Sequence, residues 1–101
     1  MQIPKRFQLL GRTFTVEQQD DFYDHERCFG ESRNYEGVIV LQTAKHKKIT
    51  FDPTMVETTF YHEMVHTILW AMNEHTLNEN EQFVDVFAGL LHQILSTAEY
   101  E

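Results

Sequence analysis

The sequence predicts a compact α+β domain, with a small, mostly antiparallel β-sheet from the N-terminal half and two long packed α-helices after it. Short runs rich in aromatic and β-branched residues, separated by glycines, fill the first half of the chain. In the second half, apolar residues recur every three or four positions over two longer segments. The chain has 101 residues, 42% of them hydrophobic, and neither a repeat nor a linker, so we expect a single domain over residues 1–101.

Composition and charge limit the classes of partner. The net charge of −8 argues against non-specific binding to nucleic acid or to an anionic membrane. No apolar run approaches the roughly 18 residues that a membrane span needs, and the first residues lack the apolar core of a signal peptide. The single cysteine, Cys28, excludes an internal disulfide and favours a cytoplasmic protein. Composition favours no particular oligomeric state.

The first strands are expected near the N-terminus. The segment Phe7–Val16 is aromatic and β-branched with Gly11 as a bend, which predicts one strand or a bent pair of short strands. The next segment, 17–25, is polar and acidic, which is typical of a loop containing at most one helical turn.

Further strands are expected before the helices. A short strand is predicted within 27–31, ending at Gly30. The clearest strand is Gly37–Leu41, an apolar run that begins at a glycine and ends at polar residues. The alternating segment Lys48–Phe51 predicts its hairpin partner.

The first helix is predicted over Pro53–Met72. Asp52 is a suitable N-cap, and Pro53 suits the first helical position because no amide donor is needed there. A core stripe at helical spacing is formed by Val56, Phe60, Met64, Val65, Ile68, Leu69 and Met72.

The second helix is predicted to end near Thr97. It begins with a capping box from Thr76 to Glu79, or with an alternative box from Asn78 to Glu81. Ala88 and Gly89 have small side chains, so the two helices are expected to approach closely there. The expected apolar stripe consists of Phe83, Phe87, Leu90, Leu91 and Ile94.

The first helix contains an H-E-x-x-H motif over residues 62–66. On a helix, His62 and His66 leave the same face one turn apart, so their ring nitrogens can bind one Zn²⁺ at about 2.0–2.1 Å each. Glu63 is placed to take the proton of a water that the metal activates. The motif therefore predicts a zinc site with Glu63 as general base, rather than a helix with two surface histidines.

A catalytic zinc site needs a third protein ligand and one open position. Glu81 and Asp85 share a face of the second helix because they are four residues apart. Folding this helix back across the first brings Glu81 to the histidines, and Asp85 can then accept the outer N–H of His62. A register shift of one turn would exchange these roles, so Asp85 remains an alternative ligand.

Other residues of ligand type are expected to have different roles. His92 lies roughly 16 Å along the helix from Glu81, too far to share the ion, and is expected to be a core or surface histidine. Glu79 is expected in the helix cap, His75 in solvent, and Cys28 as a small buried residue.

The segments Tyr61–His66 and Asn80–Asp85 together resemble the gluzincin zinc peptidases, in which an H-E-x-x-H helix is followed by a helix bearing N-E-x-x-x-D. The second segment, extended to Ala88, is also similar to the E-x-x-A-D-x-x-A helix of minimal gluzincins from small bacterial and phage metallopeptidases. The resemblance covers about residues 51–95. It implies Zn²⁺ bound by three ligands, support of a histidine by Asp85, and endopeptidase cleavage of a protein or peptide substrate. The implied ligands are His62, His66 and Glu81.

The resemblance also implies how the substrate binds. In these enzymes an edge strand above the motif helix pairs with an extended peptide, and either Gly37–Gln42 or Lys48–Phe51 is the candidate strand here. Such enzymes use a Tyr or His to stabilise the oxyanion. The residues of these types considered for that role are Tyr23, Tyr35, His46 and Tyr61.

Two alternatives to an open peptidase remain. A chain this short has little room for substrate-binding walls, so the zinc could be structural in a binding or regulatory module. Alternatively, the acidic tail over residues 99–101, or a partner, could occupy the cleft and keep the enzyme latent.

Overall fold

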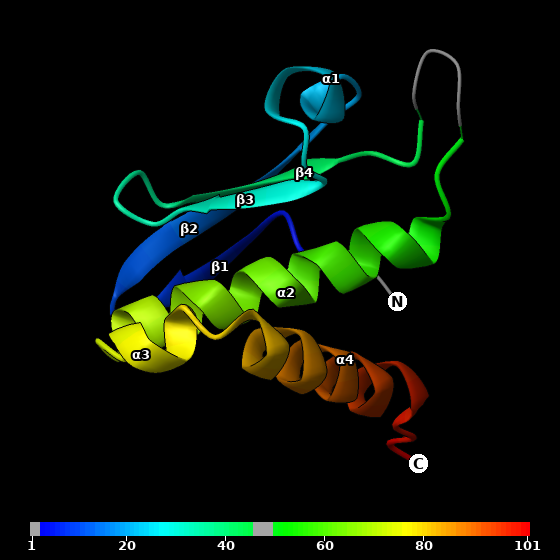
Figure 1. Ribbon diagram of the computed structural model, residues 1–101. Coiled ribbons are helices and arrows are strands. Elements are labelled where there is room, and N and C mark those ends of the chain that lie inside the picture. Colours follow the sequence, from blue (N-terminus) through cyan, green and yellow to red (C-terminus); the bar gives the residue numbers. More distant parts are fainter. Residues whose placement is uncertain (1–2, 46–49) are drawn as a thin grey trace.

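The computed structural model describes residues 3–45 and 50–101 and has an α+β architecture (Figure 1). A four-stranded sheet lies above α2, and α3 and α4 lie on the same side of the sheet as α2. The elements in chain order are β1 (Arg6–Leu9), β2 (Arg12–Gln19), α1 (Phe22–Glu26), β3 (Gly30–Arg33), β4 (Val38–Gln42), α2 (Pro53–Ala71), α3 (His75–Asn78) and α4 (Glu81–Thr97).

The sheet is mixed, with the strand order β1-β2-β4-β3. Strands β1 and β2 form an antiparallel hairpin, the second of the two arrangements expected for the N-terminal segment. Its turn residues, Leu10 and Gly11, both have positive φ (54° and 70°), as a two-residue hairpin turn favours. The outer pair β3–β4 is also antiparallel, but the central pair β2–β4 is parallel. The expectation of a mostly antiparallel sheet therefore fits the two outer pairs but not the central one.

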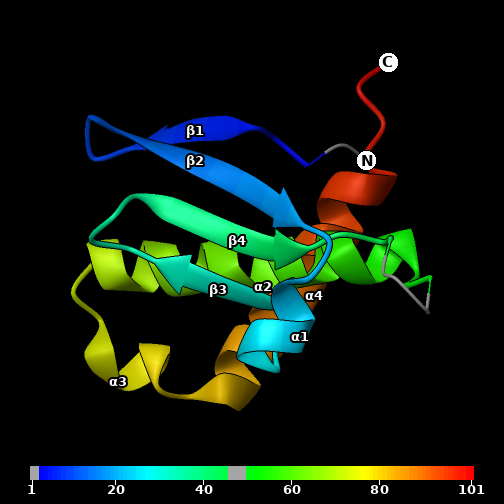
Figure 2. The ribbon, with the colours of Figure 1, turned by 90° about the horizontal axis from the view of Figure 1, so that it is seen from above.

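The crossover between the two parallel strands contains α1 and β3. Gln42, at the end of β4, is 1% exposed and anchors this connection. Its side-chain carbonyl accepts the backbone N–H of Tyr23 at 2.8 Å, and its amide donates to the backbone carbonyl of Asp20 at 2.7 Å. Figure 2 shows that the crossover leaves β3 at the edge of the sheet, over α2.

Two predicted strands need correction. The strand expected to end at Gly30 instead begins there, because Arg27 closes α1 in the left-handed conformation and delays the strand. The hairpin partner predicted over Lys48–Phe51 is also wrong in its described part. Thr50 forms only an isolated bridge with Lys45, Phe51 is in no strand, and β4 pairs with β2 and β3. Residues 48 and 49 lie outside the described residues.

Helix α2 begins as predicted. The Asp52 carboxylate accepts the backbone N–H of Thr54 at 2.9 Å, and Pro53 occupies the first helical position. The helix lies between the sheet and α4, so it is buried on more than one side. Most of the expected core stripe is buried or half-buried, but Met72 lies beyond the helix end and is 61% exposed. The core cluster consists of Ile39, Leu41, Val56, Phe60, Tyr61, Val65, Leu69, Val84 and Ala88.

Helix α4 begins at neither predicted capping box. Thr76 lies inside α3, and Glu79 is the residue that closes α3. The N-cap is Asn80, whose side-chain oxygen accepts the backbone N–H of Phe83 at 3.0 Å. The separate helical turn of α3 therefore displaces the start of the long helix.

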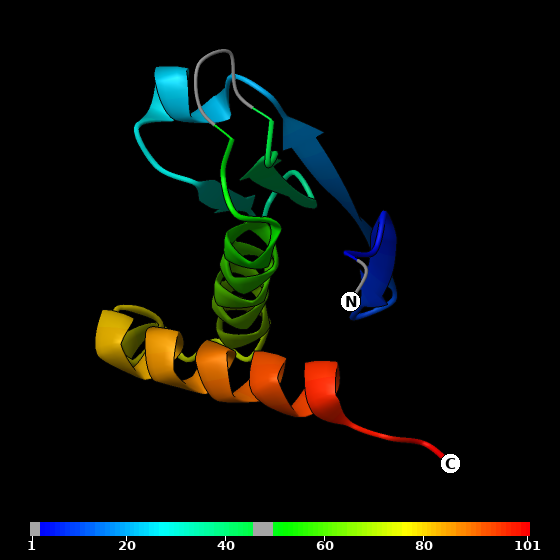
Figure 3. The same ribbon diagram turned by 90° about the vertical axis from the view of Figure 1, so that its right-hand side faces the viewer.

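The apolar stripe expected for α4 is only partly buried. Val84 and Ala88 are buried against α2, whereas Phe87, Leu90 and Ile94 are 49%, 56% and 62% exposed. Figure 3 shows α4 crossing beneath α2 as an outer layer, so only one side of α4 faces the core. A Cβ added at Gly89 would meet no atom within 4 Å, so the close approach of the helices occurs at Ala88.

None of the helices in the described part of the chain is both long enough and apolar enough to cross a membrane.

Candidate metal centre

Three side chains from two helices converge beneath the sheet. His62 and His66 lie one turn apart on α2, and Glu81 is the first residue of α4. The Nε2 atom of His62 lies 3.3 Å from Oε2 of Glu81, and Nε2 of His66 lies 3.2 Å from Oε1. One ligand atom from each residue lies within 4.8 Å of the others, which places these three residues in one candidate metal-binding cluster.

The spacing of these atoms allows them to share one metal ion. Bonds of about 2.0–2.1 Å in a tetrahedral site place neighbouring ligand atoms about 3.3 Å apart, and each Nε2 atom lies about this far from one of the two Glu81 oxygens, while all three ligand atoms lie within 4.8 Å of one another. Two imidazoles and one carboxylate are also a ligand set used by catalytic zinc, which retains a fourth position for water or substrate. The donor types therefore fit Zn²⁺, and the three residues are close enough to share one ion.

The other ring nitrogen of each histidine also has a partner. Oδ1 of Asp85 lies 2.7 Å from Nδ1 of His62, which is the contact that the sequence analysis predicted for Asp85. Oδ1 of Asn78 lies 2.5 Å from Nδ1 of His66. These oxygens hold the rings with both Nε2 atoms toward Glu81, as outer partners of metal-binding histidines do. Asn78 was missed because it lies in the short helix α3, whose position no periodic pattern reveals.

Glu63 projects from the sheet-facing side of α2 and is only 9% exposed. Burial raises the pKa of its carboxyl, against the lowering effects of His62, His66 and a hydrogen bond from the Ser32 hydroxyl. Ser32 lies on β3, so the edge strand orients this carboxylate. The chain approaches closely here, because a Cβ added at Gly30 would lie 3.2 Å from Cγ of Glu63.

Two hollows adjoin Glu63, one from each side of the cluster. The larger one is about 400 Å³ and includes His66 in its wall, and the smaller one is about 290 Å³ and includes His62. Gly30 and Glu63 line both hollows, so the surface is concave along the start of β3. The larger hollow is lined by Gly30, Glu31, Ser32, Asn34, Glu63, His66, His75, Asn78 and Glu79.

Strand β3 lies at the edge of the sheet, and its pairing register with β4 determines which of its backbone groups point toward the open side. The backbone N–H of Gln42 donates to the carbonyl of Phe29, so these two opposed residues form a hydrogen-bonded pair. Hydrogen-bonded and non-hydrogen-bonded pairs alternate along an antiparallel ladder. The backbone of Glu31 therefore forms hydrogen bonds with β4, whereas the backbone N–H and C=O groups of Gly30 and Ser32 point in the opposite direction, toward the open edge. Neither strand predicted for substrate pairing has this position, because β4 is central and Phe51 is in no strand.

The other residues that the sequence analysis weighed as ligands, His92, His75 and Glu79, lie apart from the cluster or at its rim. His92 contacts Glu57 of α2 at 3.4 Å and lies 5.3 Å from the Tyr61 ring, measured between ring centroids. His75 is exposed, as expected, but it also lines the larger hollow. Glu79 lines that hollow as well instead of capping α4.

The tyrosines considered for the oxyanion role lie away from the hollows beside Glu63, and Cys28 is not buried. Cys28 is exposed rather than buried, and its thiol contacts the carbonyl of Gly30. Tyr23 stacks on Phe29, Tyr35 is 85% exposed, and Tyr61 is in the core. None of these tyrosines lines either hollow beside Glu63. His46 lies outside the described residues.

The acidic tail lies away from the candidate cleft. Residues 98–101 are exposed and follow the end of α4, whereas Glu81 begins it. Because a helix rises about 1.5 Å per residue, the 17 residues of α4 separate the two by roughly 25 Å. The tail therefore does not occupy the cleft in this structure.

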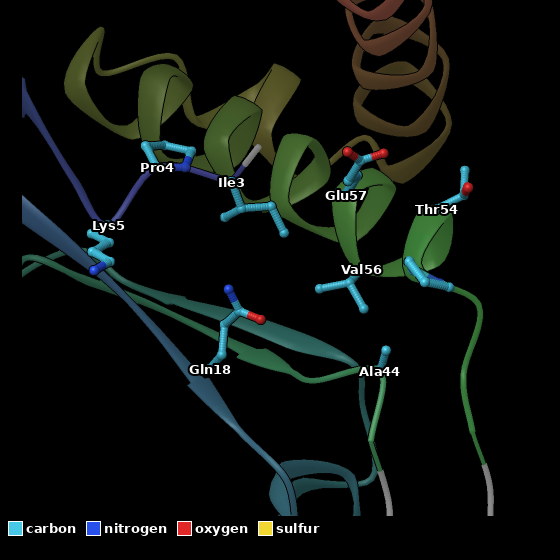
Figure 4. Close-up of a pocket in the computed structure, with 9 residues that line it drawn as sticks. Ile3, Pro4, Lys5, Gln18, Ala44, Thr54, Val56 and Glu57 are labelled. Carbon is cyan, nitrogen blue, oxygen red and sulfur yellow. The ribbon is translucent and has the colours of Figure 1, made fainter. Parts of the chain in front are cut away.

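A separate concavity of about 840 Å³ lies at the other end of α2 (Figure 4). It lies between the segment before β1, Gln18 of β2, Ala44 and the first turns of α2. Among the described residues of its wall, Lys5 and Glu57 are the charged ones, and none is a histidine or a cysteine. The described part of this lining therefore does not supply a set of metal ligands.

Comparison with known proteins reveals no relative, because no family model, no curated protein and no solved structure matches the chain.

Proposed function

We propose that this protein is a zinc-dependent endopeptidase, with His62, His66 and Glu81 as the metal ligands. The observation that carries the proposal is the meeting of two Nε2 atoms and one carboxylate beside the buried carboxylate of Glu63. A group of three ligands alone is common on acidic surfaces. Here both histidines also have an oxygen partner on their other nitrogen, and a concave surface adjoins the group. The exposed, unpaired Cys28 agrees with the proposed cytoplasmic location.

Glu63 would act as the general base and then as the general acid. When bound, Zn²⁺ supplies a Lewis acid that polarises a peptide carbonyl and lowers the pKa of a water molecule. A carboxylate oxygen of Glu63 takes the proton of the attacking water and passes it to the nitrogen of the leaving amine. The Ser32 hydroxyl orients this carboxylate by its hydrogen bond.

The proposed substrate is an extended segment of a protein or peptide, bound along β3. Gly30 and Ser32 present backbone N–H and C=O groups at the open edge, and a peptide could pair with them as an added strand. Such a peptide would pass both hollows that adjoin Glu63. Side chains with N–H donors for a developing oxyanion also line the larger hollow, namely those of Asn34, His75 and Asn78.

The variant Glu63→Gln tests the proposal. Gln retains the size of Glu63 and an oxygen that accepts from Ser32, but it cannot take a proton. We expect zinc to remain at one per chain by elemental analysis, while cleavage of unfolded casein falls by roughly 10²–10⁴-fold.

A matched control is Glu36→Gln, which changes a carboxylate in the β3–β4 turn that lines neither hollow. It should retain both zinc and cleavage. If the wild-type protein binds zinc but cleaves no unfolded protein, the metal is structural and the peptidase proposal fails. If Glu63→Gln cleaves at the wild-type rate, Glu63 is not the base.

A further inference from the structure

Strand β3 and helix α2 face each other in matched steps. In Figure 2 the strand lies along the helix, and the two run in the same direction. Two residues of a strand advance about 6.6 Å and four residues of a helix advance about 6.0 Å, so every second residue of the strand meets every fourth residue of the helix. The facing pairs are Gly30 with Thr59, Ser32 with Glu63, and Asn34 with Thr67.

Asn34, which directly follows β3, is the last strand-side residue of these pairs. Its side-chain oxygen accepts the hydroxyl of Thr67 at 2.8 Å, and Thr67 is 0% exposed. Its backbone carbonyl accepts the N–H of Gly37 and the guanidinium of Arg12, each at 3.2 Å. The backbone and the side chain of Asn34 are therefore both held in place before any substrate binds.

The amide nitrogen of this side chain, Nδ2, is open to the larger hollow beside Glu63. The bond from Thr67 holds the amide by its oxygen, so the two N–H donors on Nδ2 point elsewhere. Within the described part of the chain Nδ2 has no hydrogen-bond partner, and no buried side-chain nitrogen or oxygen there lacks one. Nδ2 is therefore accessible. Because Asn34 lines the larger hollow, a ligand in that hollow can accept a hydrogen bond from it.

The place of Asn34 along α2 brings this amide beside the candidate metal centre. Its partner Thr67 directly follows His66, so these two residues differ by about 1.5 Å along the helix axis. His66 and Glu63 line the same hollow as Asn34. Asn34 also lies one step of the strand, about 6.6 Å, beyond the residue that contacts Glu63. That separation leaves room for a reacting carbonyl about 3 Å from both groups.

The other side chains with N–H donors in this hollow, Asn78 and His75, are less suited to contact a reacting carbonyl. Oδ1 of Asn78 contacts Nδ1 of His66, whereas Nε2 of that ring faces Glu81, so Asn78 lies behind the ring. His75 is exposed on α3. Of these three side chains, Asn34 is the one that a fully buried residue holds.

We propose that the side-chain amide of Asn34 donates a hydrogen bond to the oxygen of the scissile carbonyl as negative charge develops on that oxygen. This inference rests on the proposed peptidase function and assigns it a further catalytic residue. Attack of water on the carbonyl carbon transfers one proton to Glu63 and moves the π pair of the C=O bond onto the oxygen. A donor that is already fixed in place stabilises this charge, and the loss of one such donor typically lowers kcat by about 10²–10³-fold.

Kinetics of Asn34 variants of the zinc-loaded full chain test this assignment. The substrate is a quenched fluorescent peptide with a sequence that mass spectrometry identifies as cleaved in casein. Asn34→Ala removes the amide, and Asn34→Asp keeps an oxygen for Thr67 but lacks the N–H donors. Both variants should retain one zinc per chain and lose about 10²–10³-fold in kcat. KM should change by less than about threefold, because the donor acts in the transition state.

Binding of an inhibitor gives a second measurement that does not depend on turnover. A phosphonamidate peptide of the same sequence replaces the scissile carbonyl with a tetrahedral, negatively charged group. Calorimetry should show that Asn34→Ala weakens its binding by about the same factor as kcat. Thr67→Val, which leaves the amide free to rotate, should lower kcat to a smaller extent without loss of zinc.

Controls and contrary outcomes separate this role from others. Thr97→Val, the matched change at the exposed end of α4, should have the kcat and the inhibitor affinity of the wild type. A rise in KM at unchanged kcat in Asn34→Ala would mean that the amide only binds substrate, and loss of zinc would make Asn34 a support of the metal centre. Either result overturns the assignment. A wild-type protein that binds zinc but cleaves nothing overturns the peptidase function as well, whereas a wild-type peptidase whose Asn34→Ala variant keeps both constants overturns the assignment alone.

Discussion

Histidine and carboxylate side chains of α2 and α4 meet at two places in the described part of the chain, and one of these places has the form of a metal centre. His66 contacts Glu81 at 3.2 Å, and His92 contacts Glu57 at 3.4 Å. The three histidine side chains are buried to a similar degree, with exposures of 22% for His62, 17% for His66 and 15% for His92. Neither these distances nor the burial of the rings distinguishes the two places, although Glu81 is 64% exposed and Glu57 only 18%.

The difference lies in the number and direction of the groups. At the candidate centre, two imidazoles share one carboxylate, and the opposite ring nitrogens face the oxygens of Asp85 and Asn78. At the other contact, His92 meets Glu57, and no second imidazole in the described part of the chain shares that carboxylate. A shared carboxylate with both rings held from behind is what metal ligation requires. The comparison teaches that the orientation of the rings, rather than the presence of histidine near glutamate, sets the candidate metal centre apart.

Removing either motif histidine, His62 or His66, should cause the largest loss of zinc binding, whereas removing His92 should cause none. In His62→Ala or His66→Ala only two protein ligands remain, so we expect zinc no longer to copurify at one per chain. The dissociation constant for zinc should rise by more than the roughly 100-fold upper effect of an outer partner. Competition with a chromogenic chelator measures this change. His92→Gln, the matched change at the other contact, should bind zinc like the wild type, and equal losses in all three variants would contradict the comparison.

Removing the oxygens behind the rings should give an intermediate effect. Asp85→Ala and Asn78→Ala each leave three ligands but free one imidazole to rotate, so zinc affinity should fall by roughly 10–100-fold. The same chelator competition measures this, with Gln82→Ala on the exposed side of α4 as the control. If Asp85→Ala abolishes stoichiometric zinc while Glu81→Ala retains it, Asp85 rather than Glu81 is the third ligand.

The parts of the site that follow from local sequence were predictable. The helical period places His62 and His66 on one face of α2, and the four-residue separation of Glu81 and Asp85 places both on one face of α4. The cap at Asp52 also follows from its neighbours, because an acceptor side chain before Pro53 is a strong start signal. Each of these features depends on contacts within about one helical turn.

The parts that depend on distant contacts were not predictable from periodicity. Strand β3 has the sequence Gly-Glu-Ser-Arg, which carries no β-branched or aromatic signal. Its place is set by close packing on α2, where a Cβ at Gly30 would lie 2.5 Å from Cγ2 of Thr59. Periodicity likewise marks Phe87 and Leu90 as apolar but does not reveal which part of a wide apolar arc α2 will cover.

The smallest expected effect is the loss of stability when the His92–Glu57 contact is removed. His92→Gln removes an imidazole that contacts Glu57 and the Tyr61 ring, and Gln can replace only part of these contacts. We expect the free energy of unfolding to fall by about 0.5–1 kcal/mol, the usual contribution of one hydrogen bond or partly exposed ion pair. Urea denaturation of the chelator-treated protein measures this without the contribution of bound metal. His75→Gln, at an exposed position, should change the unfolding free energy less. A loss of several kcal/mol in His92→Gln would instead show that this contact is a major support of the α2–α4 packing. The His92–Glu57 contact would then contribute more to stability than its geometry indicates.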